Sequence, residues 1–341
     1  MSQSRRPASG RPTIEDVARE AGVSRGTVSR VLNGGDHVRP EAISKVERAV
    51  KALGYSVNHA ARNLASGRTG SVAFVVSEQD EHLFSDPNFG VLVRTFSREL
   101  RRRGLHLLIT TAEDYGAESF LGDYLTAGHV DGALFALPRE GQALLARMVS
   151  SGLPLVVQGQ PLGYERELSW VAADEDAAAF EAVSYLLGLG RTVIGTITGP
   201  LNTSSGRRRL DGYQRAVGAG AAESLVASGD WSPASGRVAA WQLLERQPAI
   251  DGLFVASDLM AIEAMAVLRE SGRRIPEDVA VVGFDDSAVA VLADPPLTTV
   301  HQSFEDSASE AVRILNDLIT GARTDPQHVL MTTSLIRRRS A

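Results

Sequence analysis

The hydrophobic positions near the amino terminus follow the 3.6-residue period of short amphipathic helices. Apolar residues recur at spacings of three and four over the first of these helices, at Ile14, Val17, Ala18 and Ala21. Thr13, followed three residues later by Asp16, forms a capping-box pattern that favours a helix start. Gly22 suits the end of this helix. The pattern therefore predicts a short helix with a narrow apolar face.

A second helix is predicted directly after a very short turn. Ser24 can cap it, and its buried face would be formed by Val28, Val31 and Leu32. The residues that it exposes are polar or small: Arg25, Gly26, Ser29 and Arg30. This geometry is typical of a helix-turn-helix, in which arginine can meet the O6 and N7 acceptors of guanine in the major groove. The alternative is a helical hairpin inside a larger all-α core, with solvated arginines.

A third helix is predicted from Pro40 to Leu53, because proline favours a first turn and Gly54 follows the last apolar position. It would complete a three-helix headpiece, with Tyr55 packing back onto it. The next segment suits a hinge helix that has no apolar partner, and such a helix is marginal alone in water, so we expect it to fold on DNA. The predicted parts are a disordered basic arm, the headpiece, the hinge helix and a body, over residues 1–12, 13–57, 58–69 and 70–341.

The body alternates short apolar runs with helical periods, which indicates βαβ units and an α/β fold with mostly parallel sheets. About 270 residues exceed what one core normally serves, so two lobes are expected. Strands are predicted at residues 72–76, 105–110, 132–136, 155–158, 193–198, 252–256 and 279–284. Helices are predicted at residues 89–103, 142–150, 176–189, 206–218, 236–246 and 261–271.

Charge separates the two ends of the chain. Residues 1–68 contain twelve Lys and Arg against six Asp and Glu, whereas the whole chain has a net charge of −6. A basic headpiece on an acidic body favours contact with DNA phosphates at the predicted recognition helix, the second helix of the helix-turn-helix. Cysteine is absent, which excludes disulfides and thiol catalysis, and no apolar run approaches a membrane span. A cytoplasmic protein without a membrane partner is expected.

Polar and aromatic residues follow several predicted strands, where ligands bind in parallel sheets. The segment 78–89 follows the first strand, and Trp231, Ser257 and Asp285 follow later ones. Carboxylates and amides that bond hydroxyls, with rings that cover C–H faces, suit a polyhydroxyl ligand. Core packing is the alternative interpretation of a single aromatic residue such as Trp231.

Several motifs together resemble the LacI/GalR family of bacterial transcription regulators. In the head they are Thr13-Ile-x-Asp-Val-Ala, Ala21-Gly-Val-Ser24, Thr27 through Asn33, Val38-x-Pro40, Leu53-Gly-Tyr55 and Asn58 through Gly67. In the body they are Arg207 through Tyr213, Val255 through Asp258, Gly283 through Asp286 and Pro296 through Gln302. The resemblance covers essentially the whole chain.

The resemblance implies which residues touch DNA. Those matching Arg25, Gly26 and Arg30 face the bases, and the one matching Leu64 wedges into the minor groove. The full set is Ser24, Arg25, Gly26, Thr27, Ser29, Arg30, Asn33, Asn58 and Leu64. Gly26 has no side chain where many relatives read a base, and Val57 stands where proline commonly precedes the hinge asparagine. Recognition is therefore expected to depend on Arg25 and Arg30.

For the body, the resemblance implies a two-lobed architecture like that of periplasmic sugar-binding proteins. The expected lobes are residues 70–172 with 302–326, and residues 173–301 with 327–341. The effector-binding residues are expected to be Phe84, Asp86, Phe89, Asp174, Arg209, Trp231, Ser257, Asp285 and Gln302. Ser257 departs from the asparagine of the lactose repressor. The long acidic segment before Phe89 suits a ligand larger than one sugar ring and resembles regulators of cellobiose uptake.

The function implied is a homodimeric repressor of carbohydrate-uptake genes, bound to a near-palindromic double-stranded operator and released by a disaccharide or short oligosaccharide. No cofactor or metal is expected. A purine-type regulator that needs a corepressor is the alternative. A transport receptor would fit the body but not the head. An enzyme is disfavoured because the chain lacks a phosphate-loop lysine motif, His-Glu-x-x-His and Gly-x-Ser-x-Gly.

Overall fold

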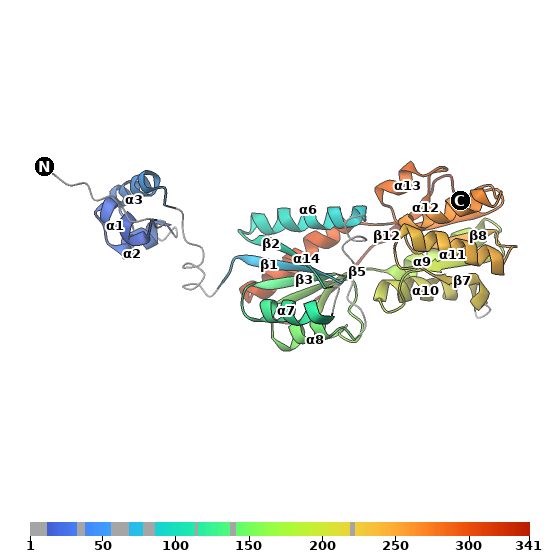
Figure 1. The fold of residues 1–341 in the computed structure, drawn as a ribbon, viewed down its shortest axis with the longest axis horizontal. Coiled ribbons are helices and arrows are strands. Elements are labelled where there is room, and N and C mark those ends of the chain that lie inside the picture. The colour runs from blue at the N-terminus through green and yellow to red at the C-terminus, as the bar shows by residue number, and fades with distance from the viewer. Residues whose placement is uncertain are drawn as a thin grey trace. The chain divides into compact units, whose positions relative to one another are not determined.

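The computed structural model describes residues 12–32, 38–55, 68–77, 86–112, 115–136, 141–218 and 222–341, without the side chains of 115–119. The chain divides into two compact units, Met1–Thr69 and Gly70–Ala341, and each is described by itself (Figure 1). Among the described residues, no helix combines the length and the apolar character needed to cross a membrane.

The first unit contains the predicted helices α1, α2 and α3, which span Ile14–Ala21, Arg25–Leu32 and Pro40–Leu53. The capping box of α1 is present: Thr13 Oγ1 accepts from the Asp16 N–H at 3.3 Å, and the Thr13 N–H donates to Asp16 Oδ2 at 2.9 Å. Gly22 ends α1 with φ +65°, a backbone conformation that favours glycine. Local capping chemistry therefore fixes this helix as the sequence predicts.

The core of the first unit lies between the three faces that the hydrophobic period selects. Val17, Val28 and Val46 are completely buried, one from each helix. Tyr55 packs against this cluster, which confirms the sequence-based expectation. Burial on one side of α2 leaves its opposite side facing solvent.

The second unit contains two six-stranded sheets. The strand order of the first sheet is β11-β5-β4-β3-β1-β2, and all of its pairings are parallel. We call this sheet with its covering helices the first lobe. Its strands are β1 (Ser71–Val76), β2 (His106–Thr111), β3 (Gly132–Ala136), β4 (Leu155–Gln158), β5 (Ser169–Ala173) and β11 (His328–Met331). Its helices are α6 (Pro87–Arg102), α7 (Tyr115–Thr126), α8 (Ala143–Ser150) and α14 (Phe304–Thr320).

The two faces of the first sheet are covered by different helices. α6 and α14 bury one face, where Phe96 and Leu315 join Phe74 of β1 in one apolar cluster. α7 and α8 bury the other face, on the opposite side of the sheet in Figure 1. Strands that are apolar on both faces are typical of parallel sheets covered by helices on both sides.

The second lobe has the strand order β12-β10-β9-β8-β6-β7, with β12 antiparallel to β10. Its strands are β6 (Ile194–Thr198), β7 (Val226–Ser228), β8 (Gly252–Val255), β9 (Ala280–Asp285), β10 (Thr298–Gln302) and β12 (Thr333–Ile336). Its helices are α9 (Glu175–Gly188), α10 (Ser204–Val217), α11 (Pro233–Arg246), α12 (Asp258–Glu270) and α13 (Ala288–Leu292); the short 3-10 helix η1 (Glu223–Leu225) precedes β7. α9 and α10 cover one face, and α11 and α12 cover the other.

The chain passes between the lobes after β5, after β10 and after β11. The last passage differs from the sequence-based boundary, which assigned residues 327–341 to the second lobe. β11 pairs with β5 in the register Val329↔Val171, so residues through Met331 belong to the first lobe. This four-residue edge strand alternates between exposed and half-buried positions, and its apolar run is only three residues long, too short to assign it from the sequence.

Candidate functional site

A cavity in the second unit is lined by residues from both lobes, including those at the carboxyl ends of the parallel strands. Of the nine residues predicted to bind an effector, six line it: Asp86, Phe89, Trp231, Ser257, Asp285 and Gln302. Arg209 lies behind this lining and contacts Asp285. Asp174 is not among the lining residues and instead caps α9, where its Oδ1 accepts from the Ala177 N–H at 3.4 Å. Phe84 lies outside the described residues.

The two walls of the cavity differ in chemistry. The first lobe contributes a mostly apolar wall, formed largely by Phe74, Val76, Phe89, Leu92 and Phe304. The second lobe contributes hydroxyls and carboxylates, among them Glu175, Ser205, Ser257 and Asp285. Such a pairing suits a ligand that has apolar C–H faces and several hydroxyl groups.

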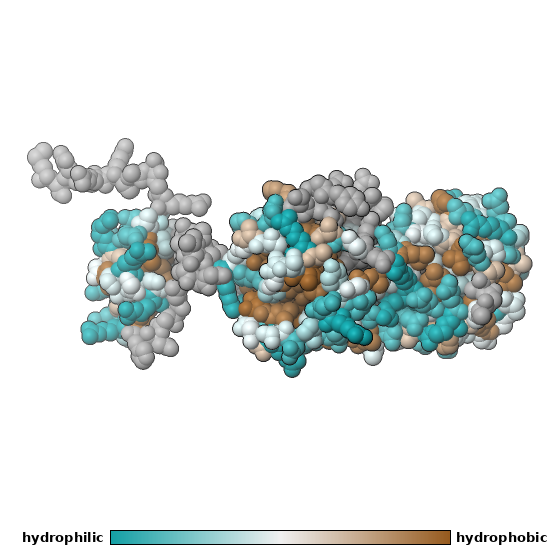
Figure 2. All heavy atoms as spheres, turned by 90° about the horizontal axis from the view of Figure 1, so that it is seen from below, coloured by the Kyte–Doolittle hydropathy of each residue, from teal (hydrophilic) through white to brown (hydrophobic). Residues whose placement is uncertain are grey.

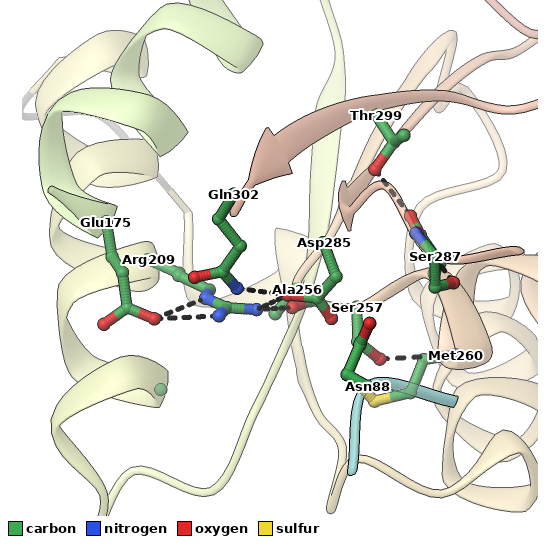
Figure 3. Close-up of polar contacts among 12 residues, drawn as sticks. Asn88, Glu175, Arg209, Ala256, Ser257, Met260, Asp285, Ser287, Thr299 and Gln302 are labelled. Atoms are coloured by element: carbon green, nitrogen blue, oxygen red, sulfur yellow. Dashed lines mark hydrogen bonds and ion pairs between the residues drawn. The ribbon is translucent and has the colours of Figure 1, made fainter. Parts of the chain in front are cut away.

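Arg209 is held by a network of acceptors (Figure 3). Its Nε and Nη2 donate to Oε1 of Glu175 at 3.1 and 2.8 Å, and its Nη1 donates to the Ala256 carbonyl and to Asp285 Oδ1, the latter at 3.3 Å. Its guanidinium also lies 3.8 Å from the ring centroid of Phe284. Arg209 is only 5% exposed, so the network is removed from water. Most of its N–H groups are therefore committed within the protein, and its main effect is to orient Asp285.

Asp285 occupies the centre of the polar wall. Gln302 Nε2 donates to its Oδ1 at 2.7 Å. Burial raises the pKa of Asp285 to about 8; the charge of Arg209 opposes this rise, and the nearby Asp258 and Asp86 add to it. The backbone of Asp285 has φ +108°, an unfavourable value for a non-glycine residue that is typical of functional sites.

Asp258 supports this wall from behind and was not among the residues predicted to bind an effector. Its Oδ2 accepts from the N–H and Oγ–H of Ser287 at 2.7 and 3.0 Å, and its Oδ1 accepts from Thr299 Oγ1 at 2.5 Å. The neighbouring Ser257 caps α12 by accepting from the Met260 N–H at 3.3 Å, which leaves its own hydroxyl proton available to a ligand. Asp258 therefore ties α12 to the segment before α13 and to β10.

Three further lining residues were not among the nine predicted to bind an effector: Asn88, Gln158 and Glu175. Glu175 begins α9 directly after β5, a strand that was not predicted, so the rule of examining strand ends did not reach it. Gln158 ends the predicted strand β4 and donates to Ser307 Oγ at 2.5 Å. Asn88 lies in the first turn of α6, where the sequence offered only the general polarity of the segment.

In the first unit, α2 presents the predicted polar surface. Ser24, Arg25, Gly26 and Arg30 are exposed, whereas Thr27 and Ser29 are half-buried. Ser24 Oγ accepts from the Thr27 N–H at 3.2 Å and so caps the helix as predicted. Arg25 lies 3.4 Å from Glu15, in an exposed ion pair of the kind that adds little stability. The predicted DNA contacts Asn33, Asn58 and Leu64 lie outside the described residues.

Comparison with known proteins supports the interpretation of both units. The family model of bacterial regulatory proteins of the lacI family matches residues 13–58, and a periplasmic binding protein-like domain matches residues 183–341. The HTH-type transcriptional regulator CelR of Thermobifida fusca is 43% identical over 334 residues, covering 97% of this chain and 98% of CelR. The chain belongs to the LacI family. It is a DNA-binding transcriptional regulator, like the ribose operon repressor of Escherichia coli strain K12, which is 30% identical over 96% of this chain and 99% of the repressor.

Solved structures of the LacI family match over both units. A complex of CelR with cellobiose has a TM-score of 0.78 and 42% identity, covering 97% of this chain and all of that one. The lac repressor dimer bound to operator and the anti-inducer ONPF has a TM-score of 0.86 and 28% identity, covering 97% of this chain and 99% of that one. The predicted fold class is thereby confirmed.

Replacing Arg30 with alanine is expected to weaken binding to a specific operator by about 1–3 kcal/mol and to relax base preference. Arg30 is exposed on the face of α2 opposite Val28, so its removal leaves the core intact. Arg19→Ala is the matched control, because Arg19 is an exposed arginine on α1 paired with Asp16. Fluorescence anisotropy with a selected operator duplex and with a random duplex measures the affinity and the base preference of each variant. Equal losses on the two duplexes would contradict a base contact by Arg30.

The stability of the second unit is expected to depend on the protonation of Asp285. The pKa of this carboxyl rises from 3.8 to about 8 through burial, so between these values the folded protein keeps a proton that the unfolded chain releases. The stability from this proton is complete below pH 3.8 and lost as pH rises through about 8. We therefore expect the native Tm to fall relative to that of Asp285→Asn as pH rises from about 6 to about 9. A Tm difference that does not change with pH would refute this linkage.

Proposed function

We propose that this regulator represses carbohydrate-uptake genes and is released from its operator by a β-linked glucose disaccharide such as cellobiose. The observation that carries the effector is the likeness to regulators named CelR: that of Thermobifida fusca is 43% identical along nearly the whole chain, and a CelR solved in complex with cellobiose is 42% identical. The cavity agrees with such a ligand, because one wall is apolar and the other carries hydroxyl, amide and carboxylate groups.

Release of the operator on ligand binding follows from the coupling of the ligand to the arrangement of the two lobes. Asp86 and Phe89 reach the cavity from the first lobe, whereas Asp285 and Trp231 reach it from the second. A ligand that touches both lobes favours one of their arrangements, and a change in that arrangement alters how a dimer presents its headpieces. In this proposal Asp285, Gln302 and Ser257 bond sugar hydroxyls, Trp231 and Phe89 cover the ring faces, and Arg209 holds Asp285 in place.

A homodimer on a near-palindromic operator completes the proposal. The first lobe carries exposed apolar side chains, including Leu108 and Ile109 on the edge strand β2 and Phe120 on α7. Figure 2 shows brown apolar surface on this lobe. Exposed apolar surface beside a sheet edge supports association with a second copy of the chain.

A thermal-shift screen of the full chain with sugars, oligosaccharides and purines tests the effector class. A ligand at a hundred times its Kd should stabilise the native state by about 2.7 kcal/mol. We expect cellobiose to raise the Tm more than glucose, ribose or guanine does. A purine that raises the Tm and tightens the operator complex would show that the effector is a corepressor and not a sugar inducer. The chain would still be a transcriptional regulator.

A further inference from the structure

The ionisable residues that line the cavity are all acidic. They are Asp86, Glu175 and Asp285, and the described lining residues include no lysine, arginine or histidine. The lining therefore offers no cation for an anionic ligand group. This contrasts with sites for phosphate or carboxylate, which are typically built from arginine or lysine side chains.

The nearest cation does not balance these carboxylates. Arg209 donates to both Glu175 and Asp285, so it is shared between two acidic groups and is committed within the protein. Asp258 adds another buried carboxyl behind the same wall, bonded to hydroxyls and a backbone N–H but to no cation. Asp286 is neutralised separately, by Arg338 Nη2 at 2.6 Å, with His301 Nδ1 at 3.0 Å on its other oxygen.

Two of the carboxylates approach the cavity from opposite lobes. Asp86 caps α6 of the first lobe, where its Oδ1 accepts from the Asn88 N–H at 2.8 Å, and Asp285 ends β9 of the second lobe. The two groups are close enough that the charge on Asp86 raises the pKa of Asp285. Burial also raises the pKa of Asp86 itself. Because Asp285 keeps its proton at neutral pH, a positive group bound between the two carboxyls would displace that proton and stabilise both ionised forms.

We propose that the cavity selects its sugar by charge: it binds a disaccharide that carries a protonated amino group between Asp86 and Asp285 more tightly than the neutral sugar, and it excludes sugars that carry a carboxylate or phosphate. An ammonium group has three donors and no acceptor, so it can bond carboxylates from both lobes at once. The neutral disaccharide scaffold in this inference rests on the proposed function.

The test compares cellobiose with analogues that differ in one group, by calorimetry on the full chain at neutral pH. One set consists of aminodeoxy cellobioses, each with one hydroxyl replaced by a primary amine. The other consists of cellobioses with one hydroxymethyl group oxidised to a carboxylate. We expect at least one amine to bind roughly ten- to a hundredfold more tightly than cellobiose, and every carboxylate to bind at least about tenfold more weakly.

A matched pair of variants assigns the preference to Asp86. Asp86→Asn removes the charge and keeps an oxygen that can cap α6, so it should bring the favoured amine to within about threefold of cellobiose. Asp211→Asn makes the same change at an exposed position of α10 outside the cavity lining and should keep the full preference. An amine preference that survives in Asp86→Asn would overturn the assignment to this pair.

The outcomes of this test distinguish the charge selection from the proposed function on which it rests. Cellobiose that binds while no amine exceeds it, or while a carboxylate analogue matches it, would overturn the charge selection and leave the proposed effector standing. Failure of cellobiose and of every analogue to bind would contradict both the charge selection and the proposed effector.

Discussion

Replacing Arg209 with methionine is expected to destabilise the second lobe by roughly 3–5 kcal/mol and to abolish the response to effector. The cost arises because Glu175 and Asp285 are buried and would lose the cation that holds them at 2.8 and 3.3 Å. Breaking one partner of a buried ion pair leaves an uncompensated charge, which costs more than the pair itself contributes. Operator binding should persist in the fraction that remains folded, because α2 lies in the other unit.

Denaturant unfolding of the full chain measures the loss at Arg209. Arg208→Met is the control, because it makes the same substitution at the neighbouring, half-buried position of α10. The double variant Arg209→Met with Glu175→Gln should recover part of the stability, since it removes the buried charge that the loss of Arg209 leaves unpaired at Glu175. A loss below about 1 kcal/mol for Arg209→Met, with effector response intact, would show that the network is not needed.

Replacing Gly212 with alanine is expected to cost about 1–3 kcal/mol and to weaken effector binding at least tenfold. Gly212 lies where α10 crosses α9, and a methyl group there would lie 2.3 Å from the Asp176 carbonyl oxygen and 2.7 Å from Ala179 Cβ. The helices would have to separate. Because Glu175 begins α9 and Arg209 lies on α10, separation lengthens the ion pair that orients Asp285.

Gly188→Ala supplies the comparison for Gly212. It lies at the carboxyl end of α9 with nothing within 4 Å of an added methyl group. Alanine should be neutral there or stabilise the helix by up to about 1 kcal/mol. Denaturant unfolding and cellobiose calorimetry on both variants give the result. Native-like binding by Gly212→Ala would contradict a positioning role for the contact between α9 and α10.

The parts of the fold that the sequence predicts well are those fixed by local signals. The capping box at Thr13, the left-handed Gly22 and the apolar period define α1 without help from the rest of the chain. The buried strands β1, β3 and β8 are equally clear, because an uninterrupted apolar run marks each of them, whereas the central strands β5 and β10 were not predicted. The edge strands β7, β11 and β12 have at most three apolar residues in a row, and their pairing with a neighbouring strand decides that they form.

α14 was missed for a different reason. Its apolar positions, from Phe304 through Ala308 and Leu315, have helical spacing, so its signal is present in the sequence. It follows β10, a strand that was also not predicted, and the chain passes between the lobes at that point. Local periodicity could have revealed this helix, although not the lobe to which it belongs.

The candidate site shows the same division. Ser257 and Asp285 lie at the ends of predicted strands, where a rule about strand ends reaches them, whereas Trp231 follows β7, which was not predicted. The role of Arg209 depends on Glu175, which lies 34 positions away in the sequence, and on a backbone carbonyl that no side-chain pattern reveals. Asp258 is similar, because its partners Ser287 and Thr299 come from other elements. Long-range pairing of buried polar groups is a property of the folded chain.

Release of operator DNA by cellobiose is the most direct test of the proposed function. A fluorescent near-palindromic duplex, selected from a random pool by the full chain, reports binding by its anisotropy. Cellobiose should lower the anisotropy to that of free DNA, glucose should leave it unchanged at the same concentration, and Asp285→Asn should shift the cellobiose response ten- to a hundredfold higher in concentration. An operator complex that cellobiose leaves intact, or tightens, would contradict control by a disaccharide inducer.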